Sequence, residues 1–413
     1  MTDDLGLFTD APAEPRSRRR RGRGARGAVK EESPGRKLQR RVTTLIVVVL
    51  GFGIVGGGLW YGWRQLSGLG GYEDYEGTGE ADVVVVVEEG DTTSAIATRL
   101  AKEDVVASAR AFVAAAADNP RISSIQPGYY KMRTRMSGEA AVQQILRPEA
   151  RVGDFEVRGG EQLNDVTVPS KDGDKVLKGI MTLISEASCA ELNGKSTCVP
   201  AEELYAVAEK ADLAELGVPE WAVAAASKAE PRRRLEGLIM PGRYWVKPGA
   251  SAEELLRDVL KTSASRLQAA GMPAVADDSG FTPYEVLVMA SLVQREAILK
   301  DFGKVARVIH NRLATAMNLG LDSTVNYTLE RQEVRTQRAE REKDTPYNTY
   351  VRNGLPPTPI GAPSKEAIAA AANPEPGTWL YFVKCEKDGT SCFSDTYKEH
   401  EAKALDAQRR GVW

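Results

Sequence analysis

The sequence predicts an α+β protein with a single N-terminal transmembrane helix. Residues 42–63 form an uncharged, mainly apolar run that is long enough to cross the ~30 Å hydrocarbon core of a bilayer as a helix. After this run, short β-branched stretches typical of strands alternate with segments of helical spacing. The 413 residues, 42% hydrophobic and 27% charged, have the composition of a globular chain that is long enough for two or three domains.

Charge sets the expected orientation of this helix. Residues 1–41 contain 12 Lys or Arg, whereas Glu73, Asp74 and Glu76 begin an acidic segment after the span. By the positive-inside rule, this is a single-pass protein of the cell membrane with a cytoplasmic N-terminus and an extracytoplasmic C-terminal body. A cleaved signal peptide is the alternative, but the leader is too long and no small-residue cleavage site follows. We expect a disordered basic cytoplasmic tail at 1–41, the membrane helix at 42–63 and a linker at 64–81.

The composition also limits the function. The formal net charge is −2 and the tail alone is near +6, so the body is near −8. An acidic body argues against nucleic-acid binding, because contact with phosphates needs clustered positive charge. With two histidines far apart and no CxxC spacing, we expect neither a zinc site nor a His-based triad.

The four cysteines lie in the part of the chain that we expect outside the cell. In an oxidising compartment, their short separations favour two local disulfides, Cys189 with Cys198 and Cys385 with Cys392. Other pairings, or four free thiols, remain open from the sequence.

Residues 82–150 have the pattern of a compact α/β module. A β-branched strand at 82–88 precedes a helix at Ser94–Lys102, a second helix near Ser108, a strand at 128–134 and a helix from Ser137 to Leu146. The intervening segment 151–231 begins with a weak echo of this pattern at 153–166, so a duplicated module is an open alternative. Its residues 200–228 are helical in pattern, with a break near Gly217-Val218-Pro219.

The region 232–413 contains the best candidate for a reactive group. Thr282-Pro283-Tyr284-Glu285 is a capping box with proline at the first helical position, which predicts a helix from there to about Lys300. Glu296 falls on the apolar face of this helix, where burial would raise its pKa as a general acid requires. The alternatives are a structural ion pair, for example with Arg312, or a helix rotated so that Glu296 faces solvent.

Other elements follow in this region. A helix from Asp301 has Val305, Val308, Ile309 and Leu313 facing inward, 321–325 is extended, and 329–343 is a charged helix. Residues 346–363 form a Pro-rich loop with many hydrogen-bonding groups, which suits a polyhydroxylated ligand or simply connects two helices. Residues 379–384 and 391–394 are predicted to be paired strands, followed by a helix that contains His400.

Five collinear blocks carry a resemblance to a known family. They are LEGLIMPGRYWV (235–246), MASLVQREA (289–297), VIHNRLATAMNLGLDSTVNY (308–327), PYNTYVRNGLPPTPIGAPS (346–364) and WLYFVKCEKDGTSCFSDTYKEHEAK (379–403). This order resembles the catalytic domain of the MltG/YceG-like endolytic murein transglycosylases. The resemblance implies a mixed α+β YceG-like catalytic domain at 232–413 and a LysM-like module at 82–150.

The resemblance also implies a chemistry. Glu296 stands at the place of the family's catalytic acid, in a lyase that cuts the MurNAc-GlcNAc β-1,4 bond of nascent peptidoglycan and leaves 1,6-anhydro-MurNAc ends, which limits strand length. It implies peptidoglycan strands, the membrane and peptidoglycan synthases of the elongation or division machinery as partners, and neither a metal nor an organic cofactor. The substrate-binding residues that it implies are Glu236, Asp322, Thr324, Tyr347, Asn348 and Thr349.

The sequence departs from the family pattern at several positions. Gln294 replaces a Glu, Gly320 and Leu321 replace a Gln and a Ser, and Gly242 replaces an Asp. The departures at Gly320, Leu321 and Gly242 favour an alternative of another class, a catalytically weak peptidoglycan-binding scaffold at the synthesis machinery, whereas Glu296 and the intact block at 346–357 favour an enzyme. A muramidase that uses water would need a second carboxylate near Glu296, for which Asp322 is the candidate.

Overall fold

The structure is a computed structural model that describes residues 72–333 and 336–412. The predicted tail at 1–41, the membrane helix at 42–63 and the first part of the linker lie outside these residues. In the part of the chain that is described, no helix combines the length and the apolar character needed to span a membrane. Tyr72–Trp413 forms one compact unit.

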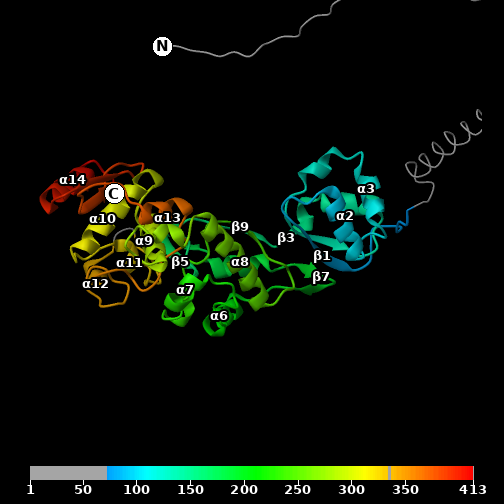
Figure 1. The fold of residues 1–413 in the computed structure, drawn as a ribbon, viewed down its shortest axis with the longest axis horizontal. Helices are drawn as coiled ribbons and strands as arrows, with labels where there is room; N and C mark the ends of the chain where they lie inside the picture. Colours follow the sequence, from blue (N-terminus) through cyan, green and yellow to red (C-terminus); the bar gives the residue numbers. More distant parts are fainter. Residues whose placement is uncertain (1–71, 334–335, 413) are drawn as a thin grey trace, which may run out of the picture. The chain divides into compact units, whose positions relative to one another are not determined.

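The α/β module at 82–150 has the predicted order of elements (Figure 1). Its elements are β1 (Asp82–Val87), α2 (Thr93–Lys102), α3 (Ala109–Ala116), β2 (Gly128–Arg133), α4 (Gly138–Ile145) and β3 (Arg151–Val152). The strands form one antiparallel sheet in the order β1-β2-β3. Thr92, Ser108 and Ser137 each cap a helix by accepting a hydrogen bond from a backbone N–H of its first turn. The module encloses its own hydrophobic core, from Val85 to Ala150.

The described part of the predicted linker, residues 72–81, is bound to this module. Asp74 accepts a hydrogen bond of 2.9 Å from the backbone of Gly138, and Thr78 pairs with Met136 as an isolated bridge. These ten residues therefore belong structurally to the module that follows them.

The rest of the chain surrounds a second hydrophobic core that extends from Phe155 to Ala372. Its strands form four two-stranded antiparallel sheets: β4 (Asp154–Val157) with β9 (Gly242–Trp245), β5 (Val166–Ser170) with β6 (Gly173–Leu177), β7 (Glu191–Leu192) with β8 (Lys195–Ser196), and β10 (Tyr381–Lys384) with β11 (Ser391–Ser394). Its helices are α5 (Ile180–Ala187), α6 (Ala201–Lys210), α7 (Glu220–Ala226), α8 (Ala252–Ala269), α9 (Pro283–Glu296), α10 (Phe302–Ala314), α11 (Asp322–Asn326), α12 (Arg338–Arg341), α13 (Lys365–Ala372) and α14 (Tyr397–Arg409). Since β4 leads into a β-hairpin and pairs with β9, the echo at 153–166 is not a duplicated module.

Helix α9 is the centre of this region. It packs against α13 and α10 (Figure 1). Its apolar stripe, including Val286, Met289 and Val293, is fully buried. The capping box at Thr282 and Glu285 is formed as predicted. The predicted end near Lys300 is wrong, because Ala297 is extended and the chain turns through Leu299–Asp301 into α10.

Two further elements differ from the sequence prediction. Residues 321–325 are not an extended stretch, because Asp322–Asn326 forms the short helix α11, in which the Thr324 hydroxyl bonds the Leu321 carbonyl. The charged helix at 329–343 is reduced to α12, because Arg331 and Gln332 pair with Thr167 across the fold instead of continuing a helix.

Both predicted disulfides are present. Cys189 is bonded to Cys198 between α5 and the segment after β8, and Cys385 to Cys392 across the β10–β11 hairpin. No free cysteine occurs among the described residues.

Candidate active site

Glu296 is the last residue of α9, and the end of the helix brings it out of the core. Its neighbours Leu292 and Val293 are buried, whereas Glu296 is half-buried. The expectation that it lies among apolar side chains is therefore corrected, because the helix stops where its stripe would have covered the carboxylate. This position leaves an acid at the edge of a rigid, well-capped helix and open on one side.

The contacts of Glu296 are few. Its Oε1 accepts a hydrogen bond of 3.3 Å from the backbone N–H of Ser323 in α11. Within residues 72–333 and 336–412, no basic side chain forms an ion pair with it, so the expected alternative of a pair with Arg312 is not formed. Arg312 instead donates to the carbonyls of Leu380, at 2.6 Å, and Leu319. Burial lowers the pKa of Arg312, and the charge of Glu296 opposes this shift.

Asp322 lies beside this carboxylate at the start of α11. Its Oδ1 accepts hydrogen bonds from the hydroxyls of Tyr350, at 2.7 Å, and Thr336, at 2.5 Å. Nε of Arg341 lies 3.8 Å from the same oxygen. The pKa of Tyr350 is raised by burial, by the hydrogen bond of its hydroxyl to Asp322 and by the charges of Asp322 and Glu296. Because both carboxylates act on one phenol, they belong to one site.

The polar residues of the 346–363 loop point into the protein. Asn348 donates to the carbonyls of Glu340, Arg341 and Lys343 and accepts from the backbone of Tyr350. These contacts hold the loop in one conformation.

Other buried residues of the loop connect it to α11. The Thr349 hydroxyl accepts from the backbone of Leu321 at 3.0 Å and lies 2.9 Å from the Thr324 hydroxyl, and the hydroxyls of Tyr347 and Thr358 are 2.9 Å apart. The side chains of Thr324, Tyr347 and Thr349 are at most 2% exposed, so they are closed to direct contact with a sugar in this structure. The loop instead positions α11 beneath Glu296.

Glu236 is also closed to solvent, at 1% exposure. Its Oε2 accepts hydrogen bonds from the Tyr327 hydroxyl, at 3.0 Å, and the backbone of Leu163, at 3.3 Å. Burial raises the pKa of Glu236 to about 7, although both hydrogen bonds and the charges of Arg233 and Arg295 oppose the shift. Glu236 is therefore a buried acid that links distant segments of the core.

Two departures from the family pattern have structural explanations. Gln294 accepts a hydrogen bond of 3.1 Å from the backbone of Ser364, the N-cap of α13. A Cβ at Gly242 would lie 2.4 Å from Nη1 of Arg266, whose guanidinium covers the ring of Tyr244. Gly242 thus leaves room for an arginine where the family pattern has a carboxylate. Gly320 adopts a left-handed φ of 55°, and Leu321 is buried.

The structure adds two residues to the site that the sequence did not single out, Tyr350 and Arg341. Tyr350 lies in the polar block at 346–357, but only the fold shows that its hydroxyl reaches Asp322. Arg341 belongs to a charged segment that looked like a solvated helix face. In the described part of the chain, no three His, Cys, Asp or Glu side chains converge as a metal site.

Comparisons with known proteins show which family the chain resembles. Residues 85–405 match the YceG-like family. The chain is 28% identical over 350 residues to the endolytic murein transglycosylase of Bacillus subtilis, covering 84% of this chain and 89% of that relative. It is 25% identical over 334 residues to the endolytic murein transglycosylase of Streptococcus pneumoniae, covering 77% of this chain but only 57% of that longer relative.

The fold also resembles a solved structure. A crystal structure of a yceG-like protein from Listeria monocytogenes matches with a TM-score of 0.51 at 24% identity, covering 78% of this chain and 99% of that chain. This likeness concerns the fold alone.

Proposed function

The chain belongs to the YceG-like family, and we propose on this premise that it is an endolytic murein transglycosylase. The observation that carries the proposal is the carboxylate of Glu296, rigidly mounted, half-exposed and without an ion pair among the described residues. The names of the relatives from B. subtilis and S. pneumoniae support the same activity.

We propose that the reaction is an intramolecular transfer with Glu296 as acid and then base. Glu296 protonates the glycosidic oxygen, and the bond between C1 of N-acetylmuramic acid and that oxygen breaks. The C6 hydroxyl of the same sugar then attacks C1, and its proton returns to Glu296, which closes a 1,6-anhydro ring without consuming water. The attacking hydroxyl is tethered to the reacting carbon, so one carboxyl group can serve both steps.

Asp322 supports this chemistry from beside Glu296. Its ionised form would stabilise positive charge that develops on the sugar ring, and the hydroxyls of Tyr350 and Thr336 hold it in place. Thr324, Tyr347, Asn348, Thr349 and Glu236, which the sequence suggested as sugar ligands, would act indirectly by fixing α11 and the loop, since their side chains are buried. The scaffold alternative loses support at Gly242, because that glycine makes room for Arg266.

The proposal also includes a membrane anchor and a glycan-binding module. A membrane helix at 42–63 would place the body outside the cell, next to nascent strands, and the module at 82–150 would be LysM-like and hold glycan. Reporter fusions at both ends of the full chain test this topology: a reporter active only outside the cell should be silent at the N-terminus and active after Tyr72. Synthases of the elongation or division machinery would supply the strands.

Product masses test the reaction. Full-length protein in detergent is incubated with purified murein, and the masses of the soluble products are determined by mass spectrometry. Anhydro ends lack the water of about 18 Da that a hydrolase adds to each cut. Hydrated, reducing muramic ends would replace the proposal with a muramidase that uses Asp322 as its second carboxylate.

A further inference from the structure

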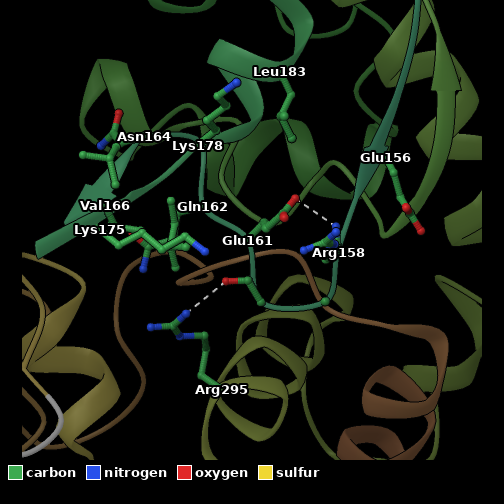
Figure 2. Close-up of a pocket in the computed structure, with 14 residues that line it drawn as sticks. Glu156, Arg158, Glu161, Gln162, Asn164, Val166, Lys175, Lys178, Leu183 and Arg295 are labelled. Carbon is green, nitrogen blue, oxygen red and sulfur yellow. Dashed lines mark hydrogen bonds between the residues drawn. The ribbon is translucent and has the colours of Figure 1, made fainter. Parts of the chain in front are cut away.

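A pocket of about 480 Å³ lies beside the end of α9 that carries Glu296. It is bounded by the loop after β4, by the β5–β6 hairpin and by Arg295 (Figure 2). Its volume is in the range of sites that hold small ligands. Arg295 and Glu296 are consecutive in α9, so this pocket flanks the proposed catalytic carboxylate.

The pocket is rich in cations. Arg158, Lys175, Lys178 and Arg295 line it, against the carboxylates of Glu156 and Glu161. Lys178 is paired with Glu186 at 2.6 Å. By contrast, Lys175 and the guanidinium of Arg158 have no carboxylate partner among the described residues. Two exposed cations are therefore available at the rim.

Arg295 forms the inner wall of the pocket, and of the four cations it is the one on which the argument for an anionic ligand mainly depends. Its guanidinium donates to the backbone carbonyl of Gly160, at 3.2 Å (Figure 2). It also donates to Oε1 of Gln332, at 2.9 Å. Both acceptors are neutral, and no carboxylate among the described residues forms an ion pair with it. Burial lowers the pKa of Arg295. The charges of Glu296 and Glu236 oppose this shift, but they act without a direct ion pair. A largely buried guanidinium that no carboxylate pairs directly is costly, and an anion from outside would complete its contacts.

Gln162 provides an independent sign of a missing ligand. It is 4% exposed and lines the pocket, yet its Nε2 has no hydrogen-bond partner in the described part of the chain. Buried amide donors in native proteins are nearly always satisfied, so an unpaired one calls for an acceptor. A carboxylate supplies such an acceptor together with the missing charge.

The mouth of the pocket also offers apolar surface. Val176 and Leu177 of β6 line it and are 57% and 42% exposed. The combination of exposed aliphatic groups and unpaired cations fits a short peptide that contains alanine and free carboxylates. Murein carries such a stem peptide on the lactyl group of each N-acetylmuramic acid.

We propose that this pocket is a subsite for a carboxylate of the murein stem peptide, and that it positions the substituted sugar at Glu296. The proposal rests on the transglycosylase function. An internal cut always has a stem peptide close to the scissile bond, because the sugar whose C1 reacts carries one. A lipid pyrophosphate, the other anion of a nascent strand, occurs only at the strand end and is absent from most internal sites.

The test compares two substrates and three proteins, all full-length in detergent. The substrates are uncrosslinked murein strands with stem peptides and the same strands after an amidase has removed the peptides. The proteins are the wild type, the double variant Arg158→Gln/Lys175→Gln and the control Lys171→Gln, which changes an exposed lysine in the hairpin turn outside the pocket. Steady-state cleavage gives KM and kcat for each pair.

We expect the wild type to have a KM about 10-fold lower for peptide-bearing strands than for bare strands, as one or two charged hydrogen bonds would produce. The double variant should lose most of this preference, through KM rather than kcat, and Lys171→Gln should retain it. Equal KM values for the two substrates in the wild type, with anhydro ends on both, would remove the subsite and leave the enzyme. A double variant that keeps the full preference would also overturn it. Failure of the wild type to cut either substrate would instead refute the transglycosylase function, and the subsite with it.

Discussion

The backbone N–H of Ser323 donates a hydrogen bond of 3.3 Å to Oε1 of Glu296, which joins the last residue of α9 to the second residue of α11. This contact sets the orientation of the carboxylate and brings it next to Asp322. The neutral acid can keep this bond, because Oε1 accepts it in either protonation state. The other oxygen therefore remains available to exchange a proton with a substrate.

Glu296→Gln should abolish most murein cleavage without unfolding the protein. The amide keeps the shape of the side chain and accepts the Ser323 hydrogen bond, but it cannot donate and recover a proton. General acid–base groups contribute ~10²–10⁴-fold, and a loss of that size in turnover is expected. Release of soluble products measures the loss, and circular dichroism checks the fold. Turnover close to that of the wild type would exclude Glu296 as the acid.

Asp322→Asn should cost less than Glu296→Gln, about 10-fold in kcat. Asparagine can still accept hydrogen bonds from Tyr350 and Thr336, but it lacks the charge that would stabilise the sugar cation. Cleavage kinetics of the two variants on the same murein preparation give the comparison. If both variants were equally inactive and the wild type released hydrated ends, a two-carboxylate hydrolase would describe the site better.

The features that local interactions determine could be predicted from the sequence. The start of α9 follows from Thr282 and Glu285, two residues whose side chains each accept a hydrogen bond from the other's backbone N–H, and the structure shows this capping box. The end of α9 depends on tertiary contacts, since buried Asp301 accepts a hydrogen bond of 2.7 Å from the backbone of Ser391, 90 residues away. No local pattern carries that information, so the helix was predicted too long and Glu296 too deep.

The same reason explains what was missed in the site. Arg331 makes ion pairs with Asp174 at 2.9 Å, and its neighbour Gln332 bonds the backbone of Thr167, so a segment with good helical spacing is held open. Glu236 accepts a hydrogen bond from Tyr327, which is 91 residues away in the sequence. A local hydrophobic pattern therefore could not predict that Glu236 is buried. Residue types and sequence blocks suggested the candidate residues, but only the fold distinguishes exposed side chains from buried ones.

Thr349→Val should lower both the free energy of unfolding and the turnover number. The separate variant Thr349→Ser keeps the hydroxyl and should have values close to those of the wild type. Valine has the shape of threonine but leaves the buried N–H of Leu321 without its acceptor. It also removes the hydrogen bond between the Thr349 and Thr324 hydroxyls, so that Thr324 keeps only its bond to the Leu321 carbonyl. An unsatisfied buried group costs about 1–3 kcal/mol, and the loss falls on the residue before α11, which positions Ser323 and Asp322. Thermal unfolding and kcat check the two effects. A valine variant with normal kcat would show that the loop does not position α11.

Glu236→Gln should remove a pH dependence of stability. In the folded protein, burial raises the pKa of Glu236 from an ordinary 4.5 to about 7. Below pH 4.5 both states hold the proton and Glu236 has no effect. Between about pH 4.5 and 7 the unfolded chain releases its proton while the folded chain keeps it, so the free energy of unfolding falls as pH rises. Above pH 7 the loss is complete, at about 3 kcal/mol.

Glutamine imitates the protonated acid, because its carbonyl can accept the hydrogen bonds of Tyr327 and Leu163 while the amide replaces the unpartnered Oε1. The variant should therefore match the wild type at pH 4.5 and exceed it at pH 8. Urea unfolding at the two pH values measures the difference, with Glu89→Gln, at an exposed position, as the control for loss of one negative charge. If wild type and Glu236→Gln lost the same stability between pH 4.5 and 8, the slope would come from other groups. Glu236 would then be ionised in the folded protein, with the charges of Arg233 and Arg295 compensating for its burial.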